Sequence, residues 1–245
     1  GGGTTLGDDA ITQSDATGGT SSGTATPVSD WTGLTDAVRK GGNVQLSGNI
    51  ALTDTLSINN KKLSIDLNGH TITAANNQRA FNINGGTLEI KDSVGNGIIQ
   101  GNGTVTGHGG AIYMEGSGSA LTISGGTIQG FTASTSGGGV YMSGGTFNMT
   151  GGAIENCTAP EGAGVKMYPD SGNTCTFTMS DSAEIKNCSN DGVSIAWSGT
   201  SKFIMSGGTI DNNKGYGLWT SSRSNTEILL LSLIHISEPT RHAQI

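Results

Sequence analysis

The sequence has 245 residues, of which 42 are glycine and only 13% are charged, and its formal net charge is −7 at pH 7. An ordinary globular chain holds about 25% charged residues and about 7% glycine. Glycine does not recur at every third position, which excludes collagen, and the low charge with abundant Ile, Val and Thr argues against a disordered chain. The negative charge disfavours a nucleic-acid partner, and no apolar run reaches the roughly 20 residues of a membrane-spanning helix. A glycine-punctuated repeat remains.

The N-terminal part of the chain contains a linker and a short helix. Residues 1–28 are rich in Gly, Ser, Thr and Asp without apolar periodicity, so they are predicted to be a flexible linker. A helix is predicted for residues 29–41, because Trp31, Leu34 and Val38 recur at helical spacing. We expect this amphipathic helix to cover the open end of the core that follows.

From residue 42 to residue 230 apolar and polar residues alternate, which is the pattern of strands with one buried face. Three kinds of short strand recur together at nearly regular intervals, which is typical of a solenoid repeat. We therefore predict an all-β fold, a right-handed single-stranded parallel β-helix of about six rungs, in which each rung covers the apolar face of the next. The second strand of each rung supplies the predicted core column, Ile72, Ile99, Ile128, Ile154, Ile185 and Ile210.

Asparagines and cysteines also occupy matching places in neighbouring rungs. Two positions after a core isoleucine lie Asn156, Asn187 and Asn212. We predict that their side chains form a structural ladder, and the alternative is that they contact a ligand. Cys157 and Cys188 lie three positions after Ile154 and Ile185. Because they occupy the same place in neighbouring rungs, their Cα atoms are expected about 4.8 Å apart. They are either bridged or two small apolar side chains in one column. Cys175 has no aligned mate, and no cysteine pair has zinc-ligand spacing.

Several repeat words resemble the right-handed β-helix proteins of the pectate-lyase-like superfamily over residues 42 to 230. They are DLNGHTI at residues 66–72, GGAIYM at 109–114 and GGGVYM at 137–142, which are typical of large secreted bacterial β-helix proteins. The words GGAI and F-x-x-N are also repeat marks of the chlamydial polymorphic outer-membrane adhesins. The resemblance implies an extracellular or cell-surface location.

That superfamily includes enzymes, so their residues can be sought here. Polygalacturonase-like hydrolases carry N-x-D, a paired aspartate, G-H-G and a basic motif in that order. Fragments at residues 190–192 and 107–109 occur in the reverse order, and no paired aspartate lies in the coil. Inverting hydrolysis needs two carboxylates about 6.5–9.5 Å apart, whereas Asp66 aligns with Lys91. No acidic cluster for calcium-dependent elimination is visible, so no catalytic, cofactor-binding or metal-binding residue is predicted.

The function expected from these observations is that of a non-catalytic rod, secreted or displayed on a bacterial surface. Its turns would serve adhesion or glycan binding, with a host surface or a polysaccharide as partner, and without nucleic acid or membrane insertion of this segment. The alternative is a fragment of a polysaccharide lyase or glycoside hydrolase whose catalytic rungs are missing or degenerate. Fold alone does not decide between them.

The last segment of the chain does not follow the repeat. Residues 231–241 read LSLIHISEPTR, which resembles the translation of a transposase-type sequencing-library adapter. We therefore expect residues 231–245 to be a non-native tail and residues 42–230 to be a β-helix truncated at its C-terminal end. His235 and His242 then leave the natural sequence, in which His70 and His108 remain.

Overall fold

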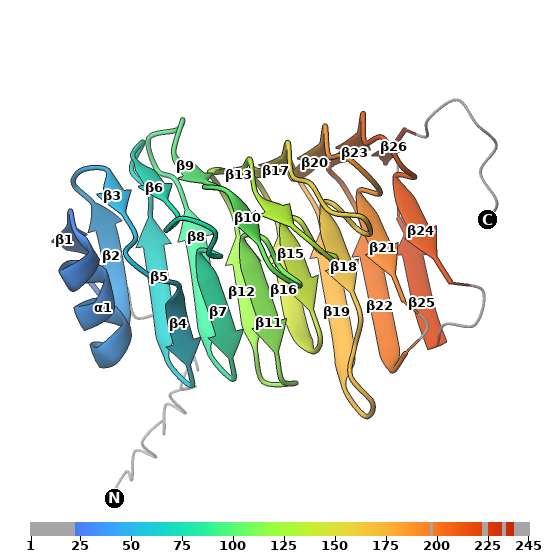
Figure 1. Ribbon diagram of the computed structural model, residues 1–245, viewed down its shortest axis with the longest axis horizontal. Coiled ribbons are helices and arrows are strands. Elements are labelled where there is room, and N and C mark those ends of the chain that lie inside the picture. The colour runs from blue at the N-terminus through green and yellow to red at the C-terminus, as the bar shows by residue number, and fades with distance from the viewer. Residues whose placement is uncertain (1–22, 197, 222–224, 232–233, 238–245) are drawn as a thin grey trace, which may run out of the picture.

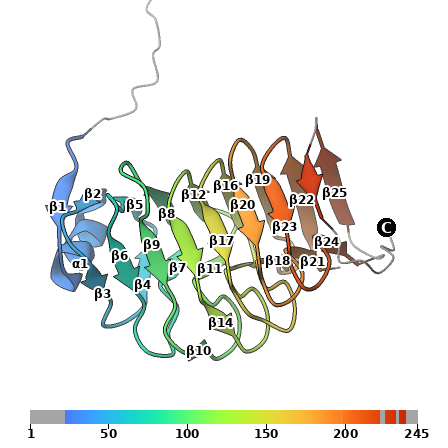
Figure 2. The same cartoon turned by 90° about the horizontal axis from the view of Figure 1, so that it is seen from above.

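The computed structural model describes residues 23–196, 198–221, 225–231 and 234–237. The chain winds through three parallel sheets, and each turn adds one strand to each sheet, so that the molecule is a rod with the turns stacked along its length (Figures 1 and 2). The predicted parallel β-helix is confirmed. In Figure 1 one sheet lies along the top of the rod, one at the back and one at the front.

Sheet A has nine strands, and all neighbouring pairs are parallel. Its strands, in spatial order, are β1 (Thr26–Val28), β2 (Gly42–Leu46), β5 (Lys62–Asp66), β8 (Thr87–Lys91), β12 (Ala120–Ile123), β16 (Gly145–Met149), β19 (Thr174–Met179), β22 (Thr200–Met205) and β25 (Asn225–Leu230). Every second side chain enters the core. Three phenylalanines follow one another there: Phe147 stacks on Phe177 with 4.5 Å between ring centroids, and Phe203 is tilted against Phe177 at 5.4 Å.

Sheet B has eight strands, and it carries the isoleucines of the predicted core column. Its strands are β3 (Ile50–Ala51), β6 (Thr71–Thr73), β9 (Ile98–Gln100), β13 (Thr127–Gln129), β17 (Ala153–Glu155), β20 (Glu184–Lys186), β23 (Thr209–Asp211) and β26 (His235–Ile236). The six isoleucines lie in direct register and are at most 1% exposed. Ile50 and Ile236 extend the same column at its two ends.

Sheet C has seven strands and forms the face on which the candidate site lies. Its strands are β4 (Leu56–Asn59), β7 (Phe81–Asn84), β11 (Ile112–Glu115), β15 (Val140–Met142), β18 (Val165–Met167), β21 (Val193–Ile195) and β24 (Leu218–Thr220). Long connections lead from sheet B to sheet C. Two of them pair with each other as a small parallel sheet of β10 (Thr104–Val105) and β14 (Thr132–Ala133), which bulges from one side in Figure 2.

The coil has about seven turns, one more than the six predicted. The turn that was missed is the first, made of β2, β3 and β4. Its isoleucine, Ile50, lies closer in sequence to Ile72 than any two neighbouring isoleucines of the predicted column lie to each other. Because the connections in this turn are short, its spacing lies outside the range of the other turns and the repeat pattern does not reveal it. Its strands nevertheless pair like the others.

A helix closes the N-terminal end of the core. The helix α1 (Trp31–Lys40) begins after Asp30, whose carboxylate accepts the Gly33 N–H at 2.8 Å, and its Leu34 is fully buried in the core. It lies within the range predicted for a capping helix. The segment predicted as linker is not linker throughout, because β1 at residues 26–28 pairs with β2. Residues 1–22 lie outside the described part of the chain.

The three asparagines predicted to form a ladder lie at the corner between sheets B and C. Asn156, Asn187 and Asn212 have left-handed backbone conformations, with φ of 52°, 57° and 52°, and their side chains are exposed. Gly130, with φ of 68°, takes the same place one turn earlier. Asparagine adopts this conformation at lower cost than most residues. The structure thus gives these asparagines a backbone role at the corner, and the side-chain ladder that their alignment predicted stays a prediction.

The paired strands continue past the boundary expected at residue 230. In β26, Ile236 pairs with Ile210 of β23, and the Ser237 hydroxyl donates to the Asp211 carboxylate. Ile234 and Ile236 are partly buried against the core. Part of the segment predicted to be non-native is therefore placed on the last turn, and its origin stays a prediction.

Candidate functional site

The outer face of sheet C carries one straight row of side chains along the rod. The central residues of the seven strands are aligned by the parallel register, and their neighbours on each strand point into the core. We call this row the outer column. From the N-terminal end it contains Ser57, Asn82, Tyr113, Tyr141, Lys166, Ser194 and Trp219.

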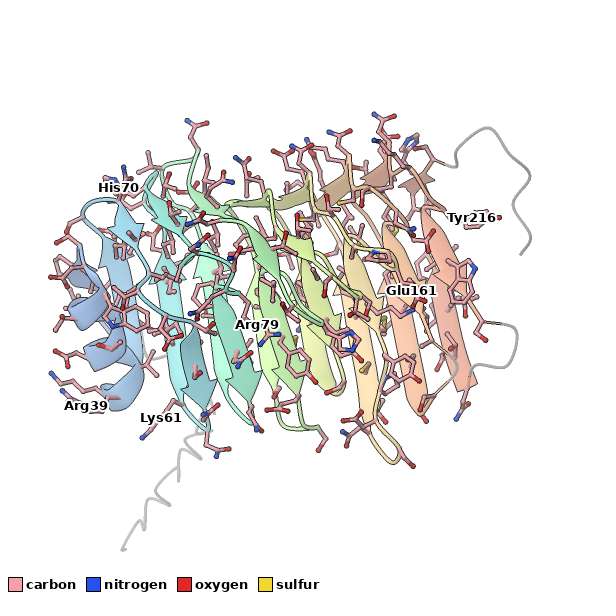
Figure 3. The ribbon with its side chains drawn as sticks, viewed as in Figure 1. Arg39, Lys61, His70, Arg79, Glu161 and Tyr216 are labelled. Carbon is pink, nitrogen blue, oxygen red and sulfur yellow. The ribbon has the colours of Figure 1, made fainter. Side chains whose placement is uncertain are left out.

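The connections from sheet B rise beside the outer column and form one wall. Parallel bridges align His108 with Ser136 and Ser136 with Glu161 in successive turns. Figure 3 shows Arg79, Glu161 and Tyr216 along this face of the rod. The column and the wall together make a polar track that runs parallel to the axis of the coil.

The first half of the track is a tightly packed stack. The Arg79 guanidinium lies 5.1 Å from the centroid of Tyr113, and the Tyr141 ring stacks on both Tyr113 and His108, with centroids 5.2 and 4.4 Å apart. Arg79 also donates to the backbone oxygens of His108 and Gly109. Burial, and then the neighbouring Arg79, lower the pKa of His108, so its ring is neutral at pH 7. Because the ring faces are occupied, this half is a stiff floor.

The second half of the track contains a hollow, because one small residue stands between two large ones. Ser194 lies between Lys166 and Trp219 in the outer column, and a cavity of about 380 Å³ opens above it. Its other walls are formed by Pro160, Glu161, Asn190, Asp191, Gly215 and Tyr216. We call this cavity the slot. Its size is at the small end of the range of ligand pockets, about 300–1,000 Å³.

A buried ammonium group organises the slot. Lys166 Nζ donates to Glu161 Oε2 and to Ser194 Oγ, both at 3.0 Å, and it lies 5.6 Å from the centroid of the Trp219 ring. The Lys166 side chain is only 5% exposed, whereas that of Glu161 is 67% exposed. A charge buried to this degree needs partners, and here the carboxylate and the hydroxyl supply them. The ammonium is therefore fixed in position.

The far wall of the slot is held by a second carboxylate. Asp191 Oδ1 accepts the Tyr216 N–H at 2.7 Å, which ties two successive turns together. Asn190 Nδ2 donates to the Pro160 oxygen at 2.8 Å and secures the connection on the other side. Burial raises the pKa of Asp191, since the cavity wall solvates its charged form poorly. The slot thus presents two carboxylates, one ammonium and the ring of Trp219.

The amino-acid sequence contains no local motif for this site, because its residues come from three successive turns. The sequence contains one usable signal, because apolar residues alternate in the third strand of each rung, at Val140 and Met142 and again at Val165 and Met167, and this alternation predicts that these side chains point inward. The residues between such pairs must then face outward, and they include Tyr141 and Lys166. Glu161 and Asp191 lie on connections of unequal length, so a fixed interval does not align them.

Of the residues considered from the sequence, His108 and Asp191 both border the track, three turns apart. Asp66 does pair with Lys91 in register, and its carboxylate is bound by backbone N–H groups at a corner, far from the slot in sequence and sheet. Cys157 and Cys188 are free thiols buried in the core. Their mutual hydrogen bond, followed by burial, raises the pKa of Cys157.

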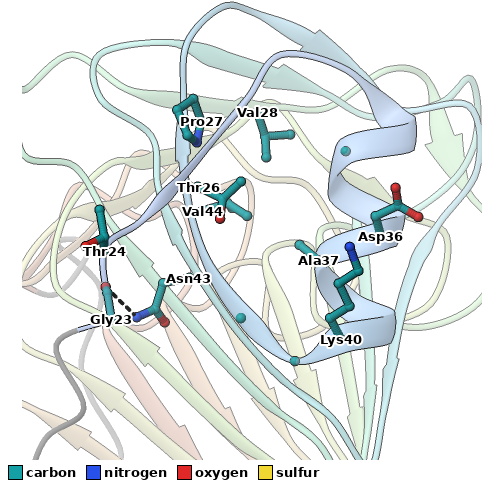
Figure 4. A pocket seen from close by; sticks show the side chains of 13 residues that line it. Gly23, Thr24, Thr26, Pro27, Val28, Asp36, Ala37, Lys40, Asn43 and Val44 are labelled. Carbon is teal, nitrogen blue, oxygen red and sulfur yellow. Dashed lines mark hydrogen bonds between the residues drawn. The ribbon is translucent and has the colours of Figure 1, made fainter.

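A larger hollow lies at the N-terminal end of the rod, between α1 and strands β1 and β2 (Figure 4). It has a volume of about 500 Å³, and its charged side chains, Asp36 and Lys40, have opposite signs. No aromatic side chain lines it, and the polar contact drawn in Figure 4 joins Asn43 to the Gly23 oxygen. The slot has the richer set of fixed polar groups, so we take it as the candidate site.

Comparison of the chain with protein-family models, with curated proteins and with solved structures gave no match. Within the described ranges, no three His, Cys, Asp or Glu side chains gather in a way that would hold a metal ion. No helix among the described residues is long and apolar enough to cross a membrane. Function is therefore inferred from the geometry of the track and the slot.

Proposed function

We propose that this chain is a non-catalytic β-helix rod, secreted or displayed on a bacterial surface, that binds glycan along the outer face of sheet C. The observation that carries the proposal is the slot, in which Ser194 leaves a hollow between Lys166 and Trp219. A sugar ring has C–H groups on its faces that suit an aromatic ring, and Trp219 is still 38% exposed although Lys166 Nζ lies over it at 5.6 Å. Its hydroxyl groups suit fixed charged partners, which make the stronger hydrogen bonds.

The shape of the track also favours a chain-like ligand. Successive turns are about 4.8 Å apart, and the outer column places one side chain per turn along a straight line. A polysaccharide lying parallel to the axis would pass over the partly exposed Tyr113, beside the buried Tyr141, before it reaches the slot. The surface location is proposed on the resemblance of the repeat words to secreted bacterial β-helix proteins.

The proposal is tested by filling the slot. Ser194→Tyr puts a ring into the hollow and replaces the buried hydroxyl that accepts from Lys166 Nζ, while Glu161 remains a partner of the ammonium. We expect glycan binding, measured by calorimetry or on a glycan array, to be lost while the unfolding transition stays cooperative. Ser194→Ala leaves the cavity open and removes one of the two partners of Lys166 Nζ, so it should still bind, although more weakly than the unmodified protein.

A control for adding a tyrosine is Ser57→Tyr, which adds the same ring to the outer column on β4, at the other end of the rod. It should bind like the unmodified protein. If Ser194→Tyr binds glycan as well as Ser194→Ala does, the slot is not the binding site.

A second candidate function, glycoside hydrolysis, is favoured by one observation. The slot brings together Glu161 and Asp191, and burial raises the pKa of Asp191, as is common for a general acid. Against it, Glu161 is paired with Lys166. Incubation with neutral and pectic glycans, with and without calcium, should release no new reducing ends or unsaturated products. Product formation that disappears in Asp191→Asn would favour the hydrolase instead.

A further inference from the structure

The charges of the slot restrict the ligand, if the slot binds glycan as proposed. Three charged side chains line it: the carboxylates of Glu161 and Asp191 and the ammonium of Lys166. The ammonium is already bonded to Glu161 at 3.0 Å and is 5% exposed. It is therefore not free to pair with a ligand, and the slot as a whole carries one negative charge more than positive.

An anionic sugar in the slot would be repelled by its excess negative charge. A uronic acid carboxylate in the slot would face Asp191 and the 67% exposed Glu161, and the whole chain carries −7. To reach Lys166, it would have to displace Glu161 from an existing ion pair. Like charges brought together at an interface disfavour the wrong partner strongly.

A cationic sugar would be repelled by the Lys166 ammonium. The favourable place for a cation in the slot is between a carboxylate and the face of an aromatic ring. Lys166 already occupies that place, with Glu161 at 3.0 Å and the Trp219 centroid at 5.6 Å. A second ammonium would have to lie beside the first. Both charged classes are thus penalised, whereas hydroxyl groups can donate to Asp191 and Glu161 without adding charge.

We propose that the slot takes uncharged hexose units, and that Glu161 and Asp191 act as specificity-determining residues that exclude uronic acids. The inference rests on the proposed function. It adds the ligand class, which the shape of the track alone does not fix.

The test compares each neutral oligosaccharide that binds with two matched forms, one oxidised at C6 to the uronate and one carrying a 2-amino group. With the full chain in calorimetry, we expect both charged forms to bind at least about tenfold more weakly than the neutral parent. Asp191→Asn, which keeps an oxygen for the Tyr216 N–H, should narrow the gap for the uronate form, and Glu161→Gln should narrow it further. Added salt should also reduce the difference in affinity between the neutral parent and the uronate form.

The control variant is Glu89→Gln, on the outer face of sheet A, which changes the net charge equally but not the slot. It should leave the preference unchanged. A uronate or amino form that binds as tightly as the neutral parent, or a preference that shifts in Glu89→Gln as much as in Asp191→Asn, would overturn the charge rule and leave glycan binding intact. If none of the neutral or charged forms binds, the proposed function itself fails and the charge rule fails with it.

Discussion

Asp66 shows how a single carboxylate stabilises a corner of the coil. It is 4% exposed, and it accepts the N–H groups of Asn68 and Ser93, both at 2.9 Å, and the side-chain amide of Gln45 at 3.0 Å. Burial by itself would raise its pKa, but these hydrogen bonds outweigh burial and lower the pKa below its ordinary value. A carboxylate with a lowered folded pKa stabilises the fold above its unfolded pKa, and this stabilisation is lost as the pH falls through the folded value.

Replacing the Asp66 carboxylate by an amide tests this stabilisation. Asp66→Asn should reduce the free energy of unfolding by about 1 to 3 kcal/mol at pH 7, because charge-assisted hydrogen bonds become neutral ones. The difference between the two proteins should shrink below about pH 4, where the carboxyl group of the unfolded chain is protonated. Urea titrations at pH 7 and pH 3 measure it. If the two proteins differ in their free energy of unfolding by the same amount at both pH values, ionisation of Asp66 does not stabilise the fold.

In the strands, the side chains that point into the core could be predicted from the sequence. Apolar and polar residues alternate along each strand, and the same alternation recurs at the matching place in the next turn, so both patterns indicate the same inward residues. For example, the alternation in TFNM at residues 146–149 recurs in TFTM at 176–179, which predicts that Phe147 and Phe177 both point inward, and the two rings stack in sheet A. What could not be predicted is the position of connections whose lengths differ from turn to turn. Glu161 and Asp191 lie on different connections, far apart in sequence, and only the folded coil brings them to one cavity.

The isoleucine column gives the second prediction. Ile154 is fully buried between Ile128 of β13 and Ile185 of β20. Ile154→Ala should cost about 2–5 kcal/mol because it leaves a cavity in the column, and Ile154→Asp should cost more because it buries an unpaired charge. Chemical denaturation measures both. A protein with aspartate at this position that unfolds like the unmodified chain would show that the register of sheet B is different.

At the scale of the whole molecule, each turn contacts chiefly its two neighbours, so changes at one end should stay local. The C-terminal end is the place to test this. There Ile234 and Ile236 pack against the last turn, and Leu230 at the end of β25 and the following Leu231 are exposed. An unpaired sheet edge with exposed apolar side chains favours pairing with another chain.

The third prediction concerns removal of residues 231–245. The main unfolding transition should keep its midpoint, because seven turns remain, while backbone amide protection should fall in β23, which loses its partner β26, and not in β22, which stays paired with β25. Hydrogen exchange followed by mass spectrometry, with a thermal melt, measures both. If deletion lowers the melting midpoint of the entire coil, these residues have a structural role that a non-native tail would not have.

Mapping a bound ligand on the protein shows whether the outer face of sheet C is the binding face and whether the slot is its main contact. NMR chemical shifts or hydrogen exchange would be recorded with and without the neutral oligosaccharide that binds most tightly. We predict changes at Lys166, Ser194 and Trp219, with smaller changes at Tyr141 and Tyr113 along the track. Changes centred on the outer face of sheet A, or on the cavity beside α1, would contradict the account.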